Sequence, residues 1–204
     1  MIKKCSITTI IWLSIYFIVL TWSAINPTDR FTWFLEVFPA LIGLLIIIAT
    51  YPRFQFSKLT YLLMLVHCVI LMVGGHYTYA EVPLFDSLSE LFGWQRNNYD
   101  KLGHFAQGFI PAAVVREIII RQKIIAKPLW QNFFTVCFCL AFSALYELIE
   151  WWVALATGEN AEAFLGTQGY QWDTQSDMML ALIGAVCFVS LCGKCQNKAI
   201  AFLV

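Results

Sequence analysis

The strongest constraint on the fold is a series of apolar runs, each close to the ~20 residues that a helix needs to cross a bilayer. The chain has 204 residues, of which 60% are hydrophobic and only 13% are charged, whereas about a quarter of the residues in a soluble domain are charged. Inside lipid, backbone polar groups must find partners within their own segment, so such runs fold as helices. The sequence therefore predicts an all-α polytopic membrane protein with a single membrane domain over residues 1–204.

Six of the apolar runs are interpreted as transmembrane helices. They cover residues 7–25, 31–50, 59–79, 102–120, 130–156 and 177–192. The fourth run is the weakest, because it contains Pro111 and ends in Arg116 and Glu117. Between the third and fourth runs, apolar residues recur at helical spacing from Phe85 to Phe92, which predicts a short interfacial helix.

Lysine and arginine side chains are concentrated on one side of these six predicted helices, in the loops that connect them and at the two ends of the chain. The positive-inside rule therefore predicts that both termini are cytoplasmic. None of the seven cysteines falls in a predicted outer loop, so no disulfide framework is expected. The formal net charge is zero, which argues against a nucleic-acid partner, because binding nucleic acid requires a basic patch.

Two carboxylates lie three residues apart near the end of the fifth run. Glu147 and Glu150 fall on nearly the same face of a helix, and a charged carboxylate that faces lipid costs roughly 2.5–3.5 kcal/mol. Counted from Trp130, they lie roughly 26 and 30 Å along the span. They are therefore expected near its outer boundary, and the adjacent Trp151 and Trp152 are typical of an aromatic belt there.

Other polar residues are expected at the same depth. Asp100 and His104 are four residues apart, as are Asp173 and Asp177, so each pair shares a helix face; Glu36 lies one turn inside the outer end of the second run. The candidate catalytic residues are Glu147, Glu150, His104 and Asp100. The candidate ligand-binding residues are Lys101, Gln168, Trp172, Asp173, Asp177 and His76.

Structural interpretations of the same residues stay open. Asp100 and Asp177 can cap helices, since a carboxylate at a helix start accepts hydrogen bonds from free N–H groups and suits the dipole. Asp173 can be an ordinary loop residue. Arg116 and Glu117 are expected to anchor their helix at the membrane interface. The two glutamates can also pair with basic side chains, namely Lys101, Arg96 or His104.

Three classes of function fit this cluster. In an enzyme at the outer leaflet, the histidine and carboxylates would act as general acid and base or bind Mg²⁺, Mn²⁺ or Zn²⁺, with a lipid head group or cell-envelope intermediate as substrate. No established catalytic signature is present. A proton- or ion-coupled transporter is the second class, although no inverted repeat is evident. A non-catalytic protein that binds a lipid or envelope ligand is the third. The residues leave the cofactor, the metal and the oligomeric state open.

Four short motifs carry a resemblance to a known family. They are NYDKLGHF at 98–105, YELIEW at 146–151, LGTQG at 165–169 and WDTQSDM at 172–178. Together they resemble the YjdF-type bacterial inner-membrane proteins over essentially the whole chain, a family without an established activity. The resemblance implies a multi-pass protein of the bacterial inner membrane. A looser similarity is to VanZ-like membrane proteins, which share an Asp-Lys-x-x-His-Phe segment, but the longer loop and the double glutamate depart from that pattern.

Overall fold

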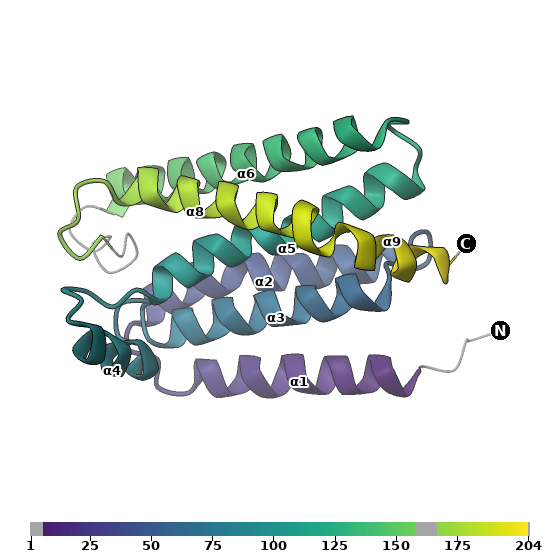
Figure 1. The fold of residues 1–204 in the computed structure, drawn as a ribbon. Coiled ribbons are helices and arrows are strands. Elements are labelled where there is room, and N and C mark those ends of the chain that lie inside the picture. The colour runs from purple at the N-terminus through teal and green to yellow at the C-terminus, as the bar shows by residue number, and fades with distance from the viewer. Residues whose placement is uncertain (1–5, 158–166, 204) are drawn as a thin grey trace.

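A computed structural model describes residues 6–157 and 167–203, and these residues form helices joined by turns, without a strand (Figure 1). The helices are α1 (Ile7–Ala24), α2 (Arg30–Thr50), α3 (Lys58–His76), α4 (Pro83–Phe92), α5 (Tyr99–Arg121), α6 (Pro128–Thr157), α8 (Asp173–Cys187), the π-helical turn η2 (Phe188–Cys192) and α9 (Gly193–Ala201). The predicted all-α class is confirmed. Leu165 and Gly166 of the LGTQG motif lie outside the described residues.

Helix starts follow directly from local sequence. Ser6, Asp29 and Ser57 precede α1, α2 and α3, and each accepts a hydrogen bond from a backbone N–H of the first turn; for Asp29 the distance from Oδ1 to the N of Thr32 is 2.7 Å. These are the residue types that cap helices best. The predicted interfacial segment forms α4, which starts at Pro83, where a missing N–H costs nothing.

Five of the described helical segments are long and apolar enough to cross a membrane. They are α1, α2, α3, α6 and the continuous run of α8, η2 and α9. Their bounds differ from the predicted spans mainly at two places. Helix α3 ends at His76 rather than at residue 79, because Thr78 and Tyr79 adopt left-handed φ angles of 53° and 57°. The last span begins four residues earlier than expected, at Asp173, and reaches Ala201.

Helix α5 corresponds to the predicted fourth span but is not among the five apolar segments, so the count of six is not confirmed. It packs against α3, α6 and α8 and buries polar residues that include Asp100, His104, Arg116 and Glu117. Because its neighbours shield it from the surroundings of the bundle, α5 can carry charged side chains without exposing them to lipid.

The helices form an antiparallel bundle with two distinct ends (Figure 1). Helix α4 and the segment that leads into α5 lie at one end, termed the α4 end. Helix α1 begins and α9 finishes at the opposite end, termed the termini end. The orientation that puts both termini in the cytoplasm stays a prediction.

Two glycines set the crossing of α5 and α8, the two central helices. A Cβ added to Gly108 would lie 1.8 Å from the backbone oxygen of Ala181, and one added to Gly184 would lie 2.2 Å from the backbone oxygen of Phe105. The backbones therefore approach as closely as only glycine allows. This contact holds the first turns of α5 beside those of α8.

Candidate functional site

One face of α5 carries three polar side chains at the α4 end. His104 Nε2 lies 3.3 Å from Asp100 Oδ1, one turn earlier, and His104 Nδ1 lies 3.1 Å from Gln107 Oε1, one turn later. All three residues are buried. Their spacing of four and three residues places them on one stripe of the helix, so the three side chains face one direction.

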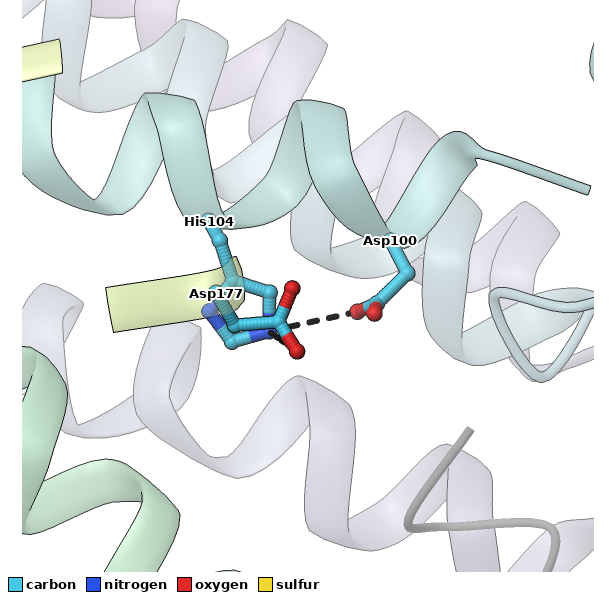
Figure 2. Close-up of side chains that lie close together, drawn as sticks. All are labelled: Asp100, His104 and Asp177. Atoms are coloured by element: carbon cyan, nitrogen blue, oxygen red, sulfur yellow. Dashed lines mark ion pairs between the residues drawn. The ribbon is translucent and has the colours of Figure 1, made fainter. Parts of the chain in front are cut away.

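Helix α8 adds Asp177 to this stripe. Asp177 Oδ2 lies 3.9 Å from His104 Nε2, and one ligand atom from each of Asp100, His104 and Asp177 lies within 4.8 Å of the others. Figure 2 shows the two carboxylates converging on the imidazole from different helices. We call these three residues the Asp-His-Asp group.

Helices α6 and α2 contribute further carboxylates. Glu147 Oε1 lies 3.7 Å from His104 Nδ1, so the histidine has carboxylates on both ring nitrogens. Glu150 is 9% exposed and Glu36 is 6% exposed. The Tyr146 hydroxyl donates to Glu36 Oε2 at 3.4 Å, which links α6 to α2 at this level.

Arg96 supplies the positive charge that holds the beginning of α8. Its Nη1 lies 2.5 Å from Asp173 Oδ1 and its Nη2 lies 3.7 Å from Asp100 Oδ2. The interpretation of Asp173 as a loop residue was wrong: it opens α8 and is buried. Asp100 and Asp177 do not occupy the capping positions, which belong to Asn98 and Trp172, but Asp100 lies in the first turn of α5, where a carboxylate suits the helix dipole.

Two predicted ligand-binding residues have structural partners close to this group. The Gln168 side chain accepts a hydrogen bond from the backbone N of Asn97 at 3.0 Å and donates one to its backbone oxygen at 2.9 Å. It therefore ties the segment before α8 to the segment before α5. The Lys101 Nζ lies over the Tyr170 ring, 5.8 Å from its centroid.

The structure does not bring the other two predicted ligand residues into the group. Trp172 is 58% exposed. His76 has its ring against Trp22, with centroids 4.5 Å apart, and its Nδ1 lies 3.0 Å from the backbone oxygen of Ser23. His76 thus has the predicted depth but faces α1, because depth along a helix does not fix rotation about it.

The α4 end carries more buried carboxylates than basic groups. The carboxylates are Glu36, Asp100, Glu147, Glu150, Asp173 and Asp177; the basic side chains among them are Arg96 and His104. Among the described residues, nothing donates a hydrogen bond to Glu147 Oε1 or Asp177 Oδ1. A buried carboxylate oxygen without a donor is costly, so this cluster favours protonation, bound water, a cation or a ligand with donors.

A cavity of about 610 Å³ starts at this cluster and runs between α2, α3, α5 and α6. At the α4 end its walls include Glu36, Asp100, His104, Tyr146 and Glu150. Farther along, the walls are mostly apolar and include Ile46, Leu71, Val115, Ile118 and Phe142. Helices α2 and α6 are not among the helix pairs in close contact in the part of the chain that the structure describes. We call this cavity the α2–α6 groove.

The fold and the buried cluster define a multi-pass helical membrane protein with a carboxylate–histidine site at one end. Residues 8–198 match the family described as "Predicted membrane protein (DUF2238)", and the chain belongs to that family. It is 50% identical over 169 residues to the inner membrane protein YjdF of Escherichia coli (strain K12), which covers 83% of this chain and 81% of that protein. No solved structure matches.

These comparisons confirm the resemblance to YjdF-type proteins and the expected localisation in the inner membrane. They do not show the VanZ-like resemblance. The family description and the name of the relative give a location and no reaction, so the chemistry of the site has to be inferred from its geometry.

Sequence reasoning missed two contributors to the site. Gln107 lies three residues after His104, and that spacing could have identified it as a partner of the imidazole. Arg96 was considered only as a possible partner of the glutamates, whereas it pairs with Asp173 and Asp100. No sequence signal reveals that choice, because Arg96 lies outside the helices whose periodicity can be read.

Proposed function

We propose that the protein binds an amine-bearing phospholipid, with the head group at the buried carboxylates and an acyl chain in the α2–α6 groove. The observation that carries this proposal is a single cavity whose α4 end is lined by carboxylates and whose remainder is mostly apolar. Such a cavity matches an amphiphile in both parts. Its volume of about 610 Å³ lies within the ~300–1,000 Å³ usual for small-molecule sites.

The length of the groove supports an acyl chain as the occupant of its apolar part. Glu36 and Thr50 both line it and are fourteen residues apart on α2, which corresponds to roughly 21 Å. That is more than half of the ~30 Å hydrocarbon core of a bilayer. Because α2 and α6 are not closely packed, a lipid can enter sideways between them.

The charge at the α4 end selects the head group. Glu36 and Glu150 line the groove, and basic side chains do not balance the buried carboxylates. A primary ammonium carries a positive charge and three donors, so it can satisfy several carboxylate oxygens at once. A head group with additional negative charge would be repelled by the same residues.

Filling the groove tests the proposal directly. Gly43 lines the groove and has nothing within 4 Å of an added Cβ, so the Gly43→Phe side chain starts in open space and should occupy part of the groove. Gly43→Ala is the matched control. Native mass spectrometry of detergent-purified protein should show bound phospholipid in the wild type and the alanine variant, and loss of it in the phenylalanine variant. Equal retention by all three proteins would refute the proposal.

Head-group preference is tested by exchange. Delipidated protein is offered phosphatidylethanolamine or phosphatidylglycerol with the same acyl chains. We expect the amine-bearing lipid to be retained preferentially, and Glu150→Gln to reduce that preference without abolishing retention. A preference for phosphatidylglycerol would contradict the assignment of the head group.

The contacts of His104 also favour a second function, acid–base catalysis on the bound lipid. An imidazole with Asp100 3.3 Å from one nitrogen and Glu147 3.7 Å from the other can accept and return a proton at a reacting oxygen. The expected observation is a mass change of the bound lipid on incubation with wild-type protein and none with Glu147→Gln. An unchanged lipid in the wild type would leave binding as the function.

A further inference from the structure

We propose that Asp100, His104 and Asp177 together bind one divalent transition-metal cation. The inference concerns the Asp-His-Asp group alone and does not depend on lipid binding in the groove. It assigns a role to the three residues at the α4 end whose possible ligand atoms all lie within 4.8 Å of one another. The case combines geometry, the tautomer of the histidine and an unsatisfied carboxylate oxygen.

The distances within the group suit a shared ion. Zinc lies about 2.0–2.2 Å from nitrogen and carboxylate ligands, so two of its ligand atoms are at most ~4.4 Å apart. His104 Nε2 lies 3.3 Å from Asp100 Oδ1 and 3.9 Å from Asp177 Oδ2. All three ligand atoms are within 4.8 Å of one another, so only a small side-chain rotation is needed to close the set.

The hydrogen bond from His104 to Gln107 directs the ring nitrogen that would bind the ion. Gln107 Oε1 lies 3.1 Å from His104 Nδ1, and an amide oxygen only accepts hydrogen bonds. With Gln107 Oε1 as the acceptor, Nδ1 carries the hydrogen, and in neutral imidazole Nε2 then presents its lone pair. That lone pair faces the Asp100 and Asp177 carboxylates, so three acceptors converge, an arrangement that a cation stabilises.

Asp177 provides an independent indication of a missing ligand. It is only 3% exposed, yet its Oδ1 has no hydrogen-bond partner among the described residues. Figure 2 shows this carboxylate directed at His104 and Asp100. An ion bound by one or both of its oxygens would supply the compensation that its surroundings do not.

The ligand set indicates the type of cation. Imidazole nitrogen favours Zn²⁺ over Mg²⁺ and Mn²⁺, which suit oxygen ligands; Mg²⁺ also retains its waters. Glu147 Oε1, 3.7 Å from His104 Nδ1, and Gln107 have the position of outer groups that orient a metal-bound histidine. Three protein ligands would leave at least one coordination position open.

Cobalt substitution tests the proposal with a spectroscopic readout. Full-length protein is purified in detergent, stripped with a chelator and titrated with Co²⁺ and then Zn²⁺. Wild-type protein should develop visible d–d absorption that saturates at one Co²⁺ per chain and disappears when Zn²⁺ displaces it. Elemental analysis should give one Zn²⁺ per chain after dialysis. Absence of saturable binding by either metal would overturn the proposal.

Substitutions locate the ion. Asp177→Asn and His104→Gln should each abolish the cobalt spectrum, while Glu90→Gln, an exposed acid at the same end, should leave it unchanged. The titrations are done in a Cys195→Ser background, because Cys195 is exposed and lies close to Cys192. Native-like tryptophan fluorescence confirms that each variant is folded. Saturable binding that survives both ligand substitutions would refute the assignment.

Gln107→Ala distinguishes a positioning role from a structural one. If Gln107 fixes the tautomer of His104, its loss should weaken Zn²⁺ binding by roughly 10–100-fold, with one ion still bound at saturation. Restoring the carbonyl with Gln107→Asn should recover part of the affinity. Unchanged affinity in Gln107→Ala would contradict the tautomer argument and, with it, the assignment of Nε2 as the ligand.

Discussion

Helix α5 carries a buried polar group at each of its ends, and the two groups differ in how completely they are satisfied. At the termini end, both Glu117 carboxylate oxygens accept hydrogen bonds, from the backbone N and hydroxyl of Ser57, the Thr60 hydroxyl and Arg121. At the α4 end, Glu147 and Asp177 each keep an oxygen without a donor. The buried carboxylate at the termini end is thus hydrogen-bonded through both oxygens, whereas two carboxylates at the α4 end are only partly hydrogen-bonded.

Arg116 is also engaged in hydrogen bonds at the termini end. Its guanidinium donates to the side-chain oxygens of Asn132, Gln196 and Asn197 at 2.8–2.9 Å, which joins α5 to α6 and α9. The expectation that Arg116 and Glu117 anchor the helix at the membrane interface stays a prediction, but both side chains point into the protein. They are 4% and 0% exposed and tie four helical elements together.

The difference separates two uses of buried charge. Charges that only hold helices together are surrounded by enough partners to offset their desolvation. Charges left without partners are destabilising and are retained where a ligand completes them. The comparison supports a structural role for the termini end and is consistent with the binding role proposed for the α4 end, and the following predictions test that division.

The largest effect is expected from Glu117→Ala. It leaves the polar groups of Ser57 and Thr60 and the guanidinium of Arg121 without their carboxylate, and breaking such a buried pair costs about 3–5 kcal/mol. Thermal unfolding in detergent, followed by tryptophan fluorescence, should show a large decrease in stability. Glu117→Gln keeps one acceptor oxygen and should fall between alanine and wild type. A small effect of the alanine variant would remove the basis for calling this end structural.

Gly108→Ala should be the next most damaging. Its new Cβ would meet the backbone of Ala181 at 1.8 Å, so α8 must move away from α5, and overpacking of this kind costs about 1–3 kcal/mol. The same displacement separates Asp177 from His104, so cobalt binding should be lost as well. Gly43→Ala, where an added Cβ meets nothing, is the control for a glycine substitution in a helix. Intact cobalt binding in Gly108→Ala would show that the crossing does not set the site.

At the α4 end, replacing a buried carboxylate should raise the stability of the protein instead of lowering it. In metal-free protein, Asp177→Asn removes one of several neighbouring buried negative charges and introduces an amide that can donate to Asp100. We expect a gain of about 0.5–2 kcal/mol in the free energy of unfolding, as is common when a functional residue is replaced. Thermal unfolding after chelation measures it. A loss comparable to that of Glu117→Ala would mean that both ends are structural.

Sequence alone could predict most of the fold, since apolar length and capping residues act locally. Ser57 and Asp29 begin helices for reasons contained in a few residues. It could also predict that Asp100 and His104 lie together, because spacing on one helix fixes their relation. The charged residues of α5 lower its hydropathy, so the sequence did not show that α5 lies at the centre of the bundle. Hydropathy measures preference for lipid, whereas α5 is enclosed by other helices.

The parts of the site that the sequence could not predict depend on how the helices rotate about their axes and cross one another. The approach of Asp177 to His104 depends on close backbone contact at Gly108 and Gly184. A glycine in the sequence does not indicate which helix it will contact. His76 lies at the end of α3 as expected, but the rotation of α3 about its own axis directs the His76 side chain to α1. The α2–α6 groove has no sequence signal either, because it lies between two helices that are not among the closely packed pairs of the described residues.

The smallest effect is expected at a cap on the α4 end, which contrasts with the buried cap formed by Ser57 and Glu117. Asp29 accepts a hydrogen bond from the backbone N of Thr32 at 2.7 Å, and that bond lowers the pKa of Asp29 below its usual value. A carboxylate with a lowered pKa stabilises the folded state above its unfolded pKa. This contribution disappears as the pH falls through the folded-state pKa.

Asp29→Ala should therefore lower stability at neutral pH by about 0.5 kcal/mol, the low end of measured cap effects, since this cap is partly exposed. The deficit relative to wild type should vanish in acid. Asp29→Asn retains a capping side chain that does not titrate, so it should match wild type at neutral pH and exceed it in acid. Thermal unfolding of the three proteins at neutral and acidic pH provides the measurement. A deficit independent of pH would mean that Asp29 acts through packing and not through its charge.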